Sequence, residues 1–136
     1  MPPKILVVDD DADMRQMLLC ALDPLGEISA AANGVDAVRL IKSRKPNLML
    51  LDVAMPEMNG LEVLHAAREL QPNIVVVMLT GESDLAIAKK ALELGARTYI
   101  TKPFDMDVVS GEVVRLLEGM SGRGGPEPYR PWRVAT

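Results

Sequence analysis

Polar side chains follow directly after three short apolar runs of this chain and after one weaker strand pattern, TYIT. They are Asp9 and Asp10 after ILVV, Asp52 after LMLL, Thr80 after IVVVML and Lys102 after TYIT. Three carboxylates, a hydroxyl and an ammonium group are suited to binding a cation and a phosphoryl group together. This chemistry requires that the fold brings the five residues to one place.

Short unbroken apolar runs are typical of parallel strands that are buried on both faces. The predicted strands are 5–8, 27–31, 48–51, 74–79 and 98–101. Between them, apolar residues recur at helical spacing and predict five helices. Their apolar faces are predicted at Met14, Met17, Leu18, Ala21 and Leu22; at Val35, Val38 and Ile41; at Leu61, Leu64 and Ala67; at Leu85, Ala88, Ala91 and Leu92; and at Val108, Val109, Val113, Leu116 and Leu117. Gly95 is placed to end the fourth helix, and Asp105 to cap the fifth.

Five strands that alternate with five helices predict an α/β fold with a doubly wound, five-stranded parallel sheet. Right-handed crossovers then place helices on both faces, and sites form beyond the carboxyl ends of the strands. All five polar residues fall at that edge. The periodic pattern stops near residue 120, so we expect one domain at 1–120 and a Gly-, Pro- and Arg-rich tail at 121–136.

Three carboxylates at one sheet edge repel one another. Two unit charges ~4 Å apart cost roughly 4 kcal/mol at an effective dielectric constant near 20, so a positive charge is needed among them. The ligand set is all oxygen, without a nearby Cys or His, which favours Mg²⁺. A carboxylate beside Mg²⁺, Lys102 and Thr80 is suited to covalent phosphoryl transfer through an aspartyl phosphate.

Four stretches carry a family resemblance: ILVVDDD at 5–11, LLDVAMPEMNG at 50–60, VMLTGES at 77–83 and TYITKPF at 98–104. With these motifs the chain resembles the response regulator receiver domains of two-component signalling, over residues 4 to about 119. The resemblance implies a flavodoxin-like three-layer fold with strand order 2-1-3-4-5. It also implies a phosphorylation-activated switch that signals through the face formed by helix 4, strand 5 and helix 5.

The resemblance assigns roles at the site. Asp52 corresponds to the phosphoacceptor and Asp10 to a direct Mg²⁺ ligand, while Asp9 holds the metal mainly through water. The backbone carbonyl of Ala54 is expected to supply a further metal ligand, and Lys102 to pair with a phosphoryl oxygen.

The resemblance also implies a switch. Thr80 is expected to bond the phosphoryl group and to move toward it, and Tyr99 then rotates inward. The peptide bond before Pro103 is expected to be cis. Ala54 stands where many members of the family carry a polar or bulky side chain, and Glu82 is the other residue expected to flank the phosphoryl group. These two residues are predicted to set the lifetime of that group.

The expected partners are a sensor histidine kinase or phosphotransfer protein, and a downstream protein target or an output domain in a longer chain. Homodimerisation on activation is compatible with the resemblance. Residues 1–120 carry 18 acidic against 12 basic residues, which argues against direct nucleic-acid binding. No apolar run approaches the ~18 residues of a membrane helix, and the N-terminus lacks a signal-peptide pattern. With a single cysteine, Cys20, the chain fits a reducing cytoplasm.

Other functions remain as alternatives. A receiver-like binding module would act without phosphorylation. A phosphatase with an aspartyl nucleophile would need a second acid near Asp52, but residue 54 is Ala. A nucleotide-binding fold of this class would need a Gly-rich loop after the first strand, and the sequence has none there.

Three further residues have simpler interpretations. Asp11 is predicted to begin the first helix as a cap. Cys20 is predicted to be a small buried apolar residue, and His65 to lie on the surface.

Overall fold

A computed structural model describes residues 2–53, 60–81 and 84–120. Its strands are β1 (Lys4–Val8), β2 (Glu27–Ala31), β3 (Leu48–Asp52), β4 (Val75–Thr80) and β5 (Thr98–Thr101). Its helices are α1 (Ala12–Leu22), α2 (Gly34–Arg44), α3 (Gly60–Leu70), α4 (Leu85–Glu93) and α5 (Met106–Met120), with a short 3-10 helix, η1, at Asp23–Leu25. All strand pairs are parallel and the sheet order is β2-β1-β3-β4-β5, which confirms the predicted fold class.

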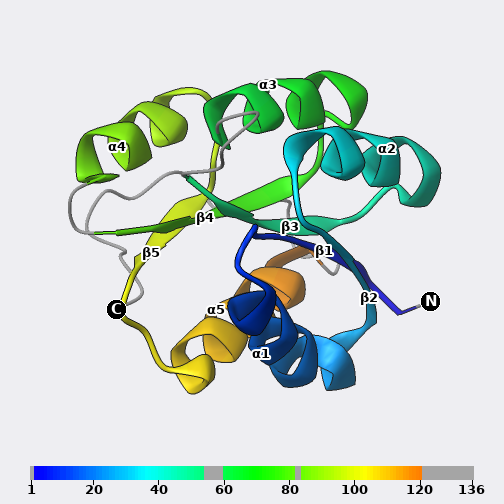
Figure 1. Ribbon diagram of the computed structural model, residues 1–136. Helices are drawn as coiled ribbons and strands as arrows, with labels where there is room; N and C mark the ends of the chain where they lie inside the picture. The colour runs from blue at the N-terminus through cyan, green and yellow to red at the C-terminus, as the bar shows by residue number, and fades with distance from the viewer. Residues whose placement is uncertain (1, 54–59, 82–83, 121–136) are drawn as a thin grey trace.

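The fold has three layers (Figure 1). Helices α2, α3 and α4 cover one face of the sheet, and α1 and α5 cover the other. Successive side chains of a strand point to opposite faces, so the central strands supply both cores. Leu6 and Met49 pack in the core beneath α2–α4, whereas Ile5 and Leu50 pack in the core beneath α1 and α5.

The register of the sheet aligns the strand ends that carry the polar residues. Val8 pairs with Leu51, Asp52 pairs with Leu79, and Thr80 pairs with Thr101. The residues that follow these strands therefore emerge at the same edge. That is the edge at which open parallel sheets bind ligands.

Local signals set the helix ends. The Asp11 carboxylate caps α1 by accepting the N–H groups of Asp13 and Met14, which confirms the predicted helix start. Gly95 adopts φ 110° after α4, as a helix-ending glycine does. Asp105 precedes α5, and its backbone carbonyl accepts the N–H of Val108.

Four predictions of burial are wrong. Met17, Val35 and Leu85 are 47%, 59% and 38% exposed, and Cys20 is also exposed. The buried residues of α1 are Leu18 and Leu22, and a residue two positions from Leu18 points to the opposite side of a helix. Cys20 is that residue. The apolar stripe of a short helix is thus wider than the face that the sheet covers.

Within the three described stretches, no helix is both long and apolar enough to cross a membrane. The tail at 121–136 lies outside these stretches. The predicted domain boundary at 120 therefore stays a prediction, although α5 is described up to Met120.

Candidate functional site

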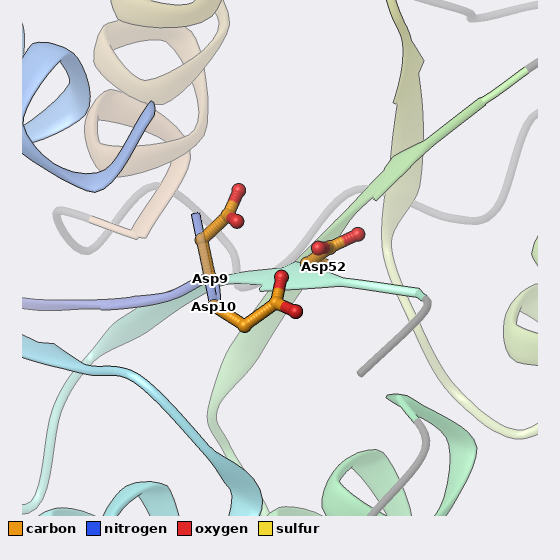
Figure 2. A group of neighbouring side chains, drawn as sticks. All are labelled: Asp9, Asp10 and Asp52. Carbon is orange, nitrogen blue, oxygen red and sulfur yellow. The ribbon is translucent and has the colours of Figure 1, made fainter. Parts of the chain in front are cut away.

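Three carboxylates meet at the carboxyl edge of the sheet (Figure 2). Asp9 and Asp10 follow β1, and Asp52 is the last residue of β3. One oxygen from each lies within 4.8 Å of the others. Asp9 is fully buried and Asp52 is nearly so, while Asp10 is exposed. The structure therefore brings together the three carboxylates that were expected to bind the metal.

Asp9 has an incomplete set of hydrogen bonds. Its Oδ1 accepts the backbone N–H of Asp11 at 2.9 Å, whereas its buried Oδ2 has no hydrogen-bond partner among the described residues. Burial raises the pKa of the Asp9 carboxyl above its usual value, and the Asp11 N–H and the charge of Lys102 offset part of this effect. A buried oxygen without a donor is the kind of group that a cation stabilises.

The acidic cluster fits Mg²⁺. Two ionised carboxylates at 4.8 Å, the upper limit of the separations here, repel by about 3.5 kcal/mol at an effective dielectric constant near 20. The donor atoms are all oxygen, and the exposed Asp10 leaves one side of the cluster open to water, which Mg²⁺ retains in its coordination shell. Ala54, the further ligand expected from the family resemblance, lies outside the described residues.

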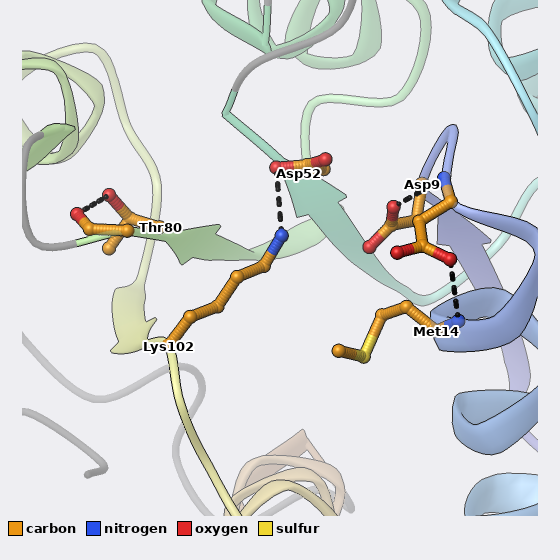
Figure 3. Close-up of polar contacts among 7 residues, drawn as sticks. Asp9, Met14, Asp52, Thr80 and Lys102 are labelled. Carbon is orange, nitrogen blue, oxygen red and sulfur yellow. Dashed lines mark hydrogen bonds and ion pairs between the residues drawn. The ribbon is translucent and has the colours of Figure 1, made fainter.

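Lys102 reaches Asp52 from the other side (Figure 3). Its Nζ donates to Asp52 Oδ1 at 3.5 Å, and the two side chains are 33% and 8% exposed. The Lys102 backbone N–H donates to the Thr80 carbonyl at 2.7 Å, and the bond between Lys102 and Pro103 is cis. An ammonium group thus stands beside the carboxylate that the resemblance assigns as phosphoacceptor.

Thr80 is fully buried at the end of β4, and its hydroxyl donates to the carbonyl of Gly81 at 3.1 Å. Tyr99, on β5, is half-buried against the core beneath α2–α4. The structure thus places both residues of the expected switch on neighbouring strands, with the hydroxyl bonded to its own loop. Glu82 lies outside the described residues.

Two further residues, Arg15 and Gly60, support the backbone around the site. Arg15, on α1, donates from Nη1 to the Asp9 carbonyl at 2.9 Å and so holds the loop that carries the carboxylates. Gly60 donates its N–H to the Val53 carbonyl, and a Cβ at Gly60 would lie 2.9 Å from the Asp52 carbonyl oxygen. Nothing in the sequence around Arg15 indicated its contact with the Asp9 carbonyl.

Two residues that were not expected to bind the metal use their side chains for other contacts. Asp11 uses its side chain for the α1 cap. His65 is exposed on α3, where Nε2 pairs with Glu69, which confirms its predicted place on the surface.

Comparisons with known proteins agree with the geometry. The family model for the response regulator receiver domain matches residues 5–113. Sporulation initiation phosphotransferase F of Bacillus subtilis (strain 168) is 36% identical over 118 residues, which cover 86% of this chain and 95% of that protein. Response regulator MprA of Mycobacterium sp. (strain KMS) is 34% identical over 128 residues, which cover 93% of this chain and 56% of that protein. The chain therefore spans almost all of one relative and about half of the other.

Solved structures give the same result. The BeF3-activated DrrB receiver domain has a TM-score of 0.79 and 34% identity, covering 87% of this chain and 99% of that one. The receiver domain of NtrX from Brucella abortus has a TM-score of 0.78 and 33% identity, covering 84% of this chain and 98% of that one.

Proposed function

The chain belongs to the response regulator receiver domain family, and we propose that it is a switch turned on by phosphorylation of Asp52. The observation that carries the proposal is the surroundings of this carboxylate. Asp52 lies at the end of β3, within 4.8 Å of the Asp9 and Asp10 oxygens and 3.5 Å from the Lys102 ammonium. A nucleophilic carboxylate between an acidic metal cluster and a cation is suited to phosphoryl transfer.

The donor is a phosphohistidine of a sensor histidine kinase or of a phosphotransfer protein. An Asp52 carboxylate oxygen forms a bond to phosphorus while the phosphorus–nitrogen bond of the donor breaks, and the bonding electrons stay on the imidazole nitrogen. Transfer needs an open approach to Asp52. The exposed Asp10 marks the side on which the cluster meets solvent.

Asp9, Asp10 and Asp52 would hold Mg²⁺, together with the backbone carbonyl of Ala54 that the family resemblance suggests. When bound, the ion offsets the carboxylate charges and the negative charge of the phosphoryl oxygens. Asp9 is preorganised for this task because the Asp11 N–H fixes one of its oxygens and leaves the other available.

Lys102 and Thr80 act on the phosphorylated state. The Lys102 ammonium donates a hydrogen bond to the Asp52 carboxylate in the resting state. After phosphorylation it donates to a phosphoryl oxygen instead. The Thr80 hydroxyl gives up its bond to the Gly81 carbonyl and donates to a second phosphoryl oxygen. Both bonds exist only after transfer, so they favour the activated conformation over the resting one.

The movement of Thr80 changes a surface of the protein. Tyr99 rotates inward as Thr80 moves, and the face formed by α4, β5 and α5 changes shape. A change of population from 1:99 to 99:1 needs about 5.5 kcal/mol of differential stabilisation. A few charge-assisted hydrogen bonds of roughly 1.5–3 kcal/mol each supply this amount.

The protein acts in the cytoplasm, where it receives the phosphoryl group from its kinase or phosphotransfer protein. Its output passes through a protein target or through an output domain of a longer chain, and not through direct nucleic-acid contacts of this domain. Activation can include homodimerisation on the α4-β5-α5 face. Slow autodephosphorylation resets the switch.

Ala54 and Glu82 set the lifetime of the phosphoryl group. A methyl group at position 54 cannot orient an attacking water, whereas Asn can, so Ala54→Asn should shorten the lifetime. Glu82→Ala removes a charge beside the phosphoryl group and should change it as well. Dephosphorylation rates that are unaltered in both variants would contradict this assignment.

The proposal is tested by phosphoryl incorporation. Incubation with Mg²⁺ and radiolabelled acetyl phosphate should label the wild type with up to one equivalent, and the label should be acid-stable and base-labile. Asp52→Asn should take up no label. Asp23→Asn, a matched change of an exposed aspartate outside the site, should be labelled like the wild type.

Two results would contradict the proposal. A chain that takes up no label under good donor conditions is a binding module that acts without phosphorylation. Steady turnover of phosphoester beyond one equivalent would instead make the protein a phosphatase.

A further inference from the structure

A second concave site lies at the opposite end of the sheet from Asp52. The cavity has a volume of about 920 Å³ and lies among the loops that lead into β3, β4 and β5. Its lining includes Lys45, Arg68 and Arg97 and, among the described residues, no carboxylate. The chain as a whole has a net charge of −4, so the positive charge of this lining is opposite in sign to that of the protein.

Arg68 is the central cation of this cavity. It lies near the end of α3, is half-buried, and has no hydrogen bond or ion pair from its guanidinium within the described residues. A Cβ at Gly95 would lie 2.7 Å from Arg68 Nε, so the side chain rests directly on the turn between α4 and β5. A planar guanidinium held in this way presents several donors to one ligand.

The backbone of the other walls is also fixed. Lys45 ends α2 in a left-handed conformation, φ 52°, and its N–H is bonded to the Ile41 carbonyl. The Gln71 side-chain amide donates to the Pro46 carbonyl and so joins the loop after α3 to the loop after α2. Preformed walls lower the entropy that a ligand would lose in ordering them.

One part of the lining is apolar. Leu70 is 42% exposed and lines the cavity, beside Ile74 and Leu92, which are only 2% and 8% exposed. Cavities of roughly 300–1,000 Å³ with an apolar lining and a few fixed polar groups are typical of small-molecule sites. The lining therefore suits a molecule with an anionic end and an uncharged end.

From these features we infer that the cavity binds an organic phosphate of nucleotide size. Its phosphoryl groups bond to Arg68 and Lys45, and its uncharged part packs against Leu70. Arg pairs with phosphate through two parallel N–H donors, which gives it an advantage over a single ammonium. This site is separate from the phosphoacceptor and does not depend on the function proposed for Asp52.

A purely structural role for these cations makes a different prediction. Basic side chains near the carboxyl end of a helix stabilise it through the helix dipole, and Arg68 lies in the last turn of α3. If that is their only role, removal of the charge lowers the melting temperature and there is no binding to lose.

The test is a titration of the full chain with ADP, pyrophosphate and adenosine, in EDTA so that the acidic cluster takes up no metal–nucleotide complex. Calorimetry gives the affinity, and amide NMR shifts locate the ligand. We expect ADP to shift residues of the cavity, with adenosine bound roughly tenfold or more weakly because it lacks the phosphates. Pyrophosphate should compete with ADP.

Arg68→Gln should weaken ADP binding roughly tenfold or more. The matched control is Arg44→Gln, which removes the same charge from an exposed residue one position before Lys45, outside the cavity lining. It should change the affinity less than about twofold. Lys45→Asn is the second variant, because Asn tolerates the left-handed conformation, and it should also weaken ADP binding.

The inference is overturned if millimolar ADP leaves the cavity resonances unshifted in the folded wild type. It is also overturned if Arg68→Gln and Lys45→Asn bind ADP as the wild type does, or if Arg44→Gln weakens binding equally.

Discussion

Replacement of Asp9 by Asn should stabilise the metal-free protein. Asp9 is buried with no partner for Oδ2 within the described residues, and its negative charge lies close to those of Asp10 and Asp52. Asn keeps an oxygen that can accept the Asp11 N–H, and its amide hydrogens can donate to the neighbouring carboxylates. The substitution therefore removes a repulsive charge and retains the hydrogen bond.

The magnitude follows from the geometry. Asp9 forms two carboxylate pairs, and unit charges at their upper-limit separation of 4.8 Å repel by about 3.5 kcal/mol per pair at an effective dielectric constant near 20. The exposure of Asp10 to water and the attraction of Lys102 reduce the total. After this reduction we expect Asp9→Asn to raise the free energy of unfolding by about 1–3 kcal/mol at pH 7 in EDTA. For a domain of this size that corresponds to a rise in Tm of roughly 3–5 °C per kcal/mol.

The effect has a definite pH dependence. Burial raises the pKa of Asp9 in the folded state above its ordinary value of 3.8, so protonation favours folding. The contribution of Asp9 to stability is fully present below 3.8 and is lost as the pH rises through the raised folded pKa. The advantage of Asp9→Asn should therefore be largest at neutral pH and shrink as the pH falls through that window.

The assay is urea unfolding of wild type and variant in EDTA from pH 4 to pH 8, and again with Mg²⁺. Mg²⁺ at 100 times its Kd should stabilise the wild type by about 2.7 kcal/mol, and the variant by much less. Asp23→Asn, outside the cluster, should show neither effect. If Asp9→Asn is less stable than the wild type in EDTA at pH 7, or is stabilised equally by Mg²⁺, the account of the acidic cluster is wrong.

Three further predictions concern the surroundings of the site. Gly60→Ala should lower the free energy of unfolding by about 1–3 kcal/mol in urea titrations, because its Cβ would lie 2.9 Å from the Asp52 carbonyl oxygen and 3.0 Å from the backbone of Val53; an unchanged midpoint would contradict the close approach. Asp11→Ala should cost about 0.5–2 kcal/mol of stability through loss of the α1 cap, and calorimetry should show Mg²⁺ affinity within about twofold of wild type; a large loss of affinity would make Asp11 a ligand. Lys102→Met should tighten Mg²⁺ binding by roughly twofold to tenfold, because the ammonium 3.5 Å from Asp52 competes with the ion; weaker binding would mean that Lys102 supports the metal site.

Much of the fold could be predicted from the sequence, because strong local signals agree with the global arrangement. The central strands β1, β3 and β4 carry unbroken apolar runs, and β2 and β5 have the predicted bounds. The site could be predicted for the same reason: Asp9, Asp52 and Thr80 stand at strand ends, and parallel strands bring their ends to one edge.

The failures have physical causes. Periodicity gives the direction of a helix face but not its width, so Met17 and Val35 were assigned to a core that does not reach them. Glu112 is 9% exposed on α5 and pairs with Arg115, and an acid at a buried helical position carries no sequence signal. The Arg15 contact with the Asp9 carbonyl depends on how α1 packs, which becomes known only once the chain is folded.

The central claim is that one phosphoryl group is carried by Asp52. The most direct measurement is to phosphorylate the protein with Mg²⁺ and acetyl phosphate, reduce the acyl phosphate with borohydride, and map the modified residue by mass spectrometry. The account predicts homoserine at position 52 alone, in at most one equivalent and only when Mg²⁺ is present. A modified residue at any other position, or none at all while the protein is folded and binds Mg²⁺, would contradict it.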